Sequence, residues 1–65
     1  MRIVLNGKPR EVAGARLEGV LEELGYQGAK VATAVNGRFV ARGLRGETAL
    51  GEGDRVEVIA PMQGG

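Results

Sequence analysis

The sequence lacks the residue types on which most enzyme active sites depend. Its 65 residues include no Cys, no His, no Ser and no Trp. Without Cys there is no disulfide framework, thiolate metal site or thiol nucleophile, and without His and Ser there is neither the commonest general base nor a serine triad. The seven Glu and one Asp are dispersed and match no metal-loop pattern. We therefore predict a protein that is not an enzyme, with no catalytic residues, no metal ion and no bound cofactor.

Charge and aromatic content argue against two classes of partner. The nine Lys and Arg residues are interleaved with eight acidic residues, the net charge is +1, and the aromatic residues are Tyr26 and Phe39. A nucleic-acid-binding surface usually has a basic stripe with stacking aromatic side chains. No apolar run approaches the roughly 18 residues of a membrane span, and the opening MRIVLNG is too short for a signal peptide. We expect no nucleic-acid or membrane partner. We also expect a cytoplasmic location, because the sequence has no Cys residues that would point to an oxidising compartment.

Turn signals divide much of the chain into strands. Asn6-Gly7 and Asn36-Gly37 each predict a tight hairpin, because Asn and Gly accept the positive φ angles of a type I′ turn. Pro9 indicates that its strand lies at a sheet edge, because Pro has no N–H to donate. The predicted strands cover residues 1–5, 8–12, 30–35, 38–40 and 55–60.

A short helix is predicted between the second and third strands. Apolar residues recur there at spacings of three and four, at Leu17, Val20, Leu21 and Leu24. Gly25 is placed to end this helix with a left-handed residue. Residues 41–53 include four Gly, and we expect an irregular surface crossing anchored by Leu44 and Leu50.

This order of elements predicts an α+β roll. One helix cannot cover both faces of a sheet, so the face opposite the helix stays exposed to solvent. A chain of 65 residues has room for one domain with one small core. We assign residues 1–60 to this domain and residues 61–65 to a flexible C-terminal tail.

The stretches AVNGRFVAR and ETALGEGDRVEVIAPMQGG, the closing Gly-Gly and the overall length resemble the ThiS/MoaD family of small sulfur carriers. The similarity covers essentially the whole chain. It implies a ubiquitin-like β-grasp fold, in which a mixed sheet of four to five strands packs one main helix on one face.

The resemblance also implies a carrier whose reactive group is the terminal carboxylate of Gly65. A ThiF-type adenylating enzyme would use ATP to convert this carboxylate to an acyl-adenylate, and a sulfur donor such as a cysteine desulfurase would then leave a thiocarboxylate. In thiamin biosynthesis the sulfur would pass to a thiazole synthase of the ThiG type. The rest of the tail consists of Pro61, Met62, Gln63 and Gly64.

Elementary chemistry agrees with a reactive C-terminus. A carboxylate is a poor electrophile until a bond to AMP supplies a leaving group. Gly64 and Gly65 have no Cβ, so their backbone can enter a narrow channel. Five extended residues reach at most about 17 Å, which lets the tail enter a cleft while the domain stays outside.

A partner-docking face is predicted on the wet side of the sheet. Side chains alternate along a strand, so Val4 and Ile59 point away from the helix. The first and last strands of a β-grasp roll are parallel neighbours, so we expect Val4 and Ile59 to lie together with Ala34, and Phe39 beside the tail. We interpret Arg38, Arg42 and Arg55 either as a polar rim around this face or, more simply, as solvated surface charge.

Two other functions fit the same sequence. A sulfur carrier for molybdopterin synthesis or tRNA thiolation shares the chemistry and differs in the acceptor, which surface shape selects. A passive β-grasp interaction module would share the fold and have an inert tail. Modification of the C-terminus separates the carriers from the passive module.

Overall fold

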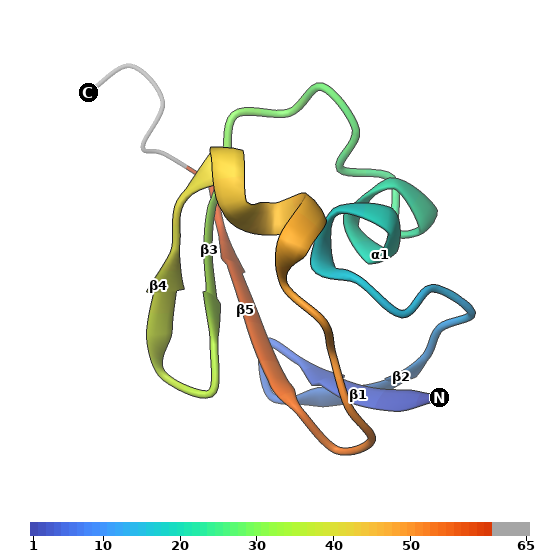
Figure 1. Cartoon of the computed structure of the whole chain (residues 1–65). Coiled ribbons are helices and arrows are strands. Elements are labelled where there is room, and N and C mark those ends of the chain that lie inside the picture. Colours follow the sequence, from blue (N-terminus) through green and yellow to red (C-terminus); the bar gives the residue numbers. More distant parts are fainter. Residues whose placement is uncertain (61–65) are drawn as a thin grey trace.

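A mixed sheet with a helix against one face forms the fold (Figure 1). The structure is a computed structural model that describes residues 1–60. The strands are β1 (Arg2–Leu5), β2 (Lys8–Glu11), β3 (Ala32–Val35), β4 (Arg38–Val40) and β5 (Arg55–Ile59). Their order is β2-β1-β5-β3-β4, in which β1 and β5 are parallel and all other neighbours are antiparallel. The predicted α+β roll and its five strands are confirmed, and β5 lies at the centre of the sheet.

Both Asn–Gly pairs form the predicted hairpin turns. Asn6 and Asn36 have φ angles of 49° and 52°, and the glycine after each has a φ angle of 84°. Positive φ at both central positions is the requirement of a type I′ turn, which matches the right-handed twist of the paired strands. Strand β2, which contains Pro9, lies at the edge of the sheet as predicted.

Helix α1 (Leu17–Glu23) ends in the way that the sequence predicts. Gly25 has a φ angle of 91°. The N–H of Tyr26 donates to the carbonyl of Leu21 at 2.8 Å, and the N–H of Gly25 donates to the carbonyl of Glu22 at 3.1 Å. This pair of bonds is the Schellman motif, which satisfies carbonyls that a helix end would otherwise leave unpaired.

The start of α1 depends on other segments, since no side chain caps it. The N–H of Leu17 donates to the carbonyl of Thr48 at 2.9 Å. At the far end of the helix, Glu23 reaches back and accepts from the N–H groups of Ala13 at 2.8 Å and Gly14 at 3.0 Å. These two backbone donors lower the pKa of the Glu23 carboxyl. The loop before the helix is thereby tied to the helix itself.

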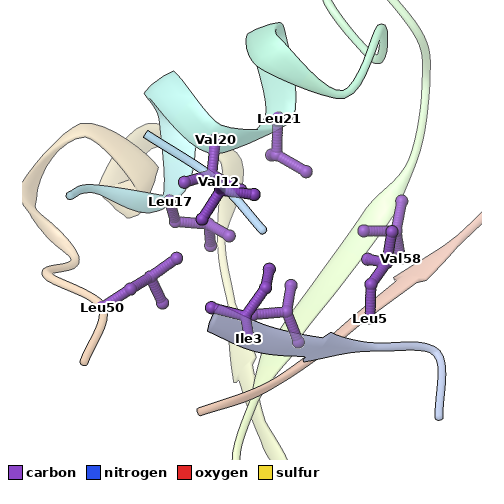
Figure 2. Close-up of a cluster of buried hydrophobic side chains, with 9 residues drawn as sticks. Ile3, Leu5, Val12, Leu17, Val20, Leu21, Leu50 and Val58 are labelled. Carbon is purple, nitrogen blue, oxygen red and sulfur yellow. The ribbon is translucent and has the colours of Figure 1, made fainter. Parts of the chain in front are cut away.

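The hydrophobic core fills the space between α1 and the inner face of the sheet (Figure 2). Strands β1 and β5 contribute their inward-pointing residues, and α1 contributes one stripe. Leu50 closes the core from the crossing segment, as predicted. The buried members are Ile3, Leu5, Val12, Leu17, Val20, Leu21, Leu50, Val56 and Val58.

The prediction for residues 41–53 is partly wrong. A 3₁₀ helix, η1 (Arg42–Glu47), occupies much of this segment and packs against α1. Leu44, an expected anchor, is 55% exposed, whereas Arg45 is 8% exposed. The Arg45 Nε donates to the Thr33 hydroxyl at 3.0 Å, and its Nη2 donates to the Val31 carbonyl at 2.6 Å. The side chain of Arg45 therefore anchors this segment, and a pattern of apolar residues in the sequence cannot predict an anchor of this kind.

Candidate functional site

The chain leaves the sheet at the end of β5, beside the starts of β3 and η1 (Figure 1). Ile59 lies opposite Ala32, and Val40, two residues before η1, lies opposite Thr33. The predicted reactive tail lies outside the described residues, so the division at residue 60 and the roles of its members stay predictions. These members are Pro61, Met62, Gln63, Gly64 and Gly65.

The side chain of Asn6 holds the last part of β5. Its Oδ1 accepts from the N–H of Val58 at 2.9 Å, and its Nδ2 donates to the carbonyl of Val58 at 3.2 Å. The N–H of Asn6 donates to the carbonyl of Val56 at 2.9 Å. One side-chain amide thus extends the parallel ladder of β1 and β5 after the β1 backbone has turned away. The bonded residue lies immediately before Ile59, so Asn6 holds β5 close to its last residue.

The second hairpin holds the start of β5 in a related way. The Asn36 Oδ1 accepts from the N–H of Arg55 at 2.9 Å, and the Asn36 Nδ2 donates to the Asp54 carboxylate at 3.1 Å. The N–H of Gly51 also donates to that carboxylate, at 2.7 Å. The Gly51 donor, and after it Asn36, lowers the pKa of Asp54. Sequence reasoning predicted both Asn–Gly turns and missed these side-chain bonds, because the turn alone accounts for an Asn at each position.

The four residues predicted to form a docking face do share the face of the sheet opposite α1. Along β5, Val56 and Val58 are buried while Ile59 is 62% exposed. Phe39 is 72% exposed and lies directly opposite Ala34 in the register of β3 and β4. Val4 and Ala34 are half-buried.

The predicted contact between Val4 and Ile59 is wrong. Val4 lies opposite Arg55, four residues before Ile59 on β5. At a rise of about 3.3 Å per residue, the separation is about 13 Å, which their side chains cannot bridge. The register places Ala32, rather than Val4, beside Ile59. We call the remaining neighbours the exit patch; it consists of Ala32, Ala34, Phe39 and Ile59.

A hollow next to the exit patch has no counterpart in the sequence predictions. It has a volume of about 290 Å³ and lies between the start of β3 and η1. We call it the cationic hollow; it is lined by Ala29, Lys30, Val31, Ala32, Arg42 and Arg45. The spacing of three between Arg42 and Arg45 is the sequence signal that could have found it, because residues at i and i+3 of a 3₁₀ helix lie on one side.

The described part of the chain has neither a metal-binding cluster nor a membrane-spanning helix. No group of three or more His, Cys, Asp or Glu side chains within residues 1–60 could hold a metal ion. No helix in the same range is both long and apolar enough to cross a membrane. The expectation that no cofactor is bound stays a prediction.

The sequence is similar to proteins of thiamin biosynthesis. The model of the ThiS family matches residues 3–65. The sulfur carrier protein ThiS of Thermus thermophilus is 43% identical over 61 residues, which cover 94% of this chain and 95% of the relative. The thiazole synthase of Magnetococcus marinus is 44% identical over 66 residues and is matched by the whole of this chain. The chain spans only 20% of that relative's length.

The fold is similar to a solved structure from the same group. The crystal structure of the thiamine biosynthesis protein ThiS from Geobacter metallireducens superposes with a TM-score of 0.82 at 33% sequence identity, over the full length of both chains. This likeness confirms the predicted β-grasp fold. The family match covers nearly the whole sequence, including the closing Gly-Gly. The chain belongs to the ThiS family.

Proposed function

We propose that this protein carries sulfur, as a thiocarboxylate at Gly65, for the formation of the thiazole ring of thiamin. The Gly65 carboxylate attacks the α-phosphorus of ATP on an adenylating enzyme of the ThiF type, and pyrophosphate leaves. A donor at the oxidation level of sulfide then attacks the acyl carbon and AMP leaves, so that one carboxylate oxygen is replaced by sulfur. A cysteine desulfurase with a thiol reductant is a suitable donor. The protein is a co-substrate in these steps and not their catalyst.

The observation that carries this proposal is the family match through residue 65, together with the position of β5. A central strand, hydrogen-bonded on both sides, ends at Ile59, and the closing Gly-Gly follows it in the sequence. The folded domain then needs only to position the C-terminus for its partner enzymes. The sequence has no Cys, His or Ser for nucleophilic or general-base catalysis by side chains.

Thiazole synthase is the acceptor that the comparisons favour over molybdopterin or tRNA. Two similar proteins, from Magnetococcus marinus and Paramagnetospirillum magneticum, are named thiazole synthase, and each is matched over the whole of this chain. A single polypeptide in those organisms therefore contains a segment like this one within a protein of that name. Transfer of sulfur from Gly65 to a separate thiazole synthase extends this relationship to the present chain.

Intact mass spectrometry tests the proposal. The protein is incubated with the adenylating enzyme, MgATP, a cysteine desulfurase, cysteine and a thiol reductant. Exchange of one oxygen for sulfur raises the mass by about 16 Da. Omission of ATP, or deletion of Gly65 from a variant that keeps its circular dichroism spectrum, must abolish the increase. An unchanged mass in the complete reaction would instead support a passive interaction module.

A further inference from the structure

The cationic hollow presents three positive side chains and no negative one. Arg42 and Arg45 lie one turn apart on the same side of η1, and Lys30 joins them from the segment that leads into β3. Lys30 and Arg42 are exposed, whereas Arg45 forms the buried wall.

Within the part of the chain that the structure describes, none of these three cations is paired with a carboxylate. Within residues 1–60 the ion pair joins Arg2 and Glu11, on β1 and β2 at the opposite edge of the sheet. Arg45 donates to two neutral oxygens, those of Thr33 and Val31. The residue Arg45 is 8% exposed, and a positive side chain that is largely removed from water favours an anion next to it.

Acidic side chains line an adjoining hollow of about 200 Å³ between α1 and η1. Glu18 and Glu22 line it together with Arg42 and Arg45, yet neither forms an ion pair with them. Within residues 1–60, no carboxylate therefore lies within ion-pair distance of the cations on the β3 side of η1.

The position of the hollow connects it to the tail. Its lining residue Ala32 lies opposite Ile59, where β5 ends. The five residues after Ala60 span at most about 17 Å. A partner that holds Gly65 in an active site must therefore bring its own surface over this end of the domain.

We propose that the cationic hollow binds carboxylate side chains of the adenylating partner, at the rim of the channel that takes the tail. This inference rests on the proposed function and specifies the chemistry of the partner surface. Arg42 and Arg45 present planar guanidinium groups that suit carboxylates, and Lys30 adds a mobile charge at the edge. Such exposed charges steer association and make it sensitive to salt.

Steady-state kinetics with two charge-matched double variants test this site. Lys30→Glu/Arg42→Glu changes the hollow, and Lys8→Glu/Arg10→Glu makes the same change of charge at exposed positions of β2, at the opposite edge of the sheet. ATP–pyrophosphate exchange by the adenylating enzyme is measured against carrier concentration, in low salt and in about 500 mM NaCl. Urea midpoints establish that both double variants are folded.

In low salt, the hollow variant is expected to raise KM for the carrier by at least about tenfold, while kcat and the KM of the control variant stay within about twofold. High salt should raise the KM of the original protein towards that of the hollow variant. Equal KM values for the two double variants would overturn the inference and leave the proposed function intact. No exchange with the original protein would overturn both.

Discussion

At the scale of single residues, two asparagines act both in turns and in strand pairing. Asn6 and Asn36 supply the positive φ of their hairpins, and their side chains then bond to the backbone of β5. The turn role was predictable from the Asn–Gly pairs alone. The bonding role was not, because it depends on the parallel neighbour that tertiary structure places beside the turn.

Replacing Asn6 by Gly separates these two roles. Asn6→Gly keeps a residue that tolerates positive φ and removes both side-chain bonds to Val58. We expect a loss of about 1–2 kcal/mol in the free energy of unfolding, measured by urea denaturation, because the Val58 backbone groups lose partners where β5 is partly buried. An Asn6→Gly variant as stable as the original protein would show that the turn is the only role of Asn6.

Arg45 is expected to matter for stability far more than its neighbour Arg42. Arg45→Met removes donors to Thr33 and Val31 and should lower the free energy of unfolding by about 1–3 kcal/mol. Arg42→Met, on the same side of the same short helix but exposed, is the control and should change it by less than about 0.5 kcal/mol. Equal effects of the two substitutions would contradict the anchoring role of Arg45.

At the scale of elements, regular patterns were predicted and irregular ones were not. The hairpins, the stripe of α1 and its end at Gly25 follow from local chemistry, and the structure has them. The 3₁₀ helix η1 lacks an apolar period, since its anchor is an arginine among glycines. The register of β1 against β5 also escaped prediction, because residue alternation determines the face of a side chain but not its position along the neighbouring strand.

The exit patch gives the element-scale prediction. Ile59→Glu places a charge at an exposed position, so folding should be nearly unaffected, while affinity for the adenylating enzyme should fall by about tenfold or more as apolar contact is lost. Ile59→Leu keeps the apolar surface and should retain affinity. Isothermal titration calorimetry measures both. An unchanged affinity for Ile59→Glu would exclude the exit patch from the docking surface.

At the scale of the whole molecule, two carboxylates link stability to pH. The backbone N–H groups of Ala13 and Gly14 lower the pKa of Glu23, and the backbone N–H of Gly51, followed by the side-chain amide of Asn36, lowers the pKa of Asp54. A carboxyl whose pKa is lower in the folded state stabilises that state above the unfolded pKa, near 4, and this contribution is lost as the pH falls towards the folded pKa.

The urea midpoint should therefore decrease as the pH falls from about 5 to about 2. Asp54→Asn and Glu23→Gln remove the titrating groups, so each should make this decrease smaller. If the urea midpoint of the double variant Glu23→Gln/Asp54→Asn depends on pH as strongly as that of the original protein, the effect belongs to other carboxyl groups.

The candidate site was less predictable from the sequence than the fold. The shared outer face of Ala34, Phe39 and Ile59 followed from alternation, and the structure has it. The cationic hollow did not follow, because it forms where β3 and η1 meet in space. The tail, the cytoplasmic location and the identity of the sulfur donor stay predictions.

Fragmentation of the product by tandem mass spectrometry tests the central claim most directly. The protein is treated with the adenylating enzyme, MgATP and the sulfur donor, and the increase of about 16 Da is then located along the chain. If the main-chain terminus is the reactive group, only fragments that contain Gly65 carry the increase. An increase found on fragments from residues 1–60, or none on the terminal fragment, would contradict the account.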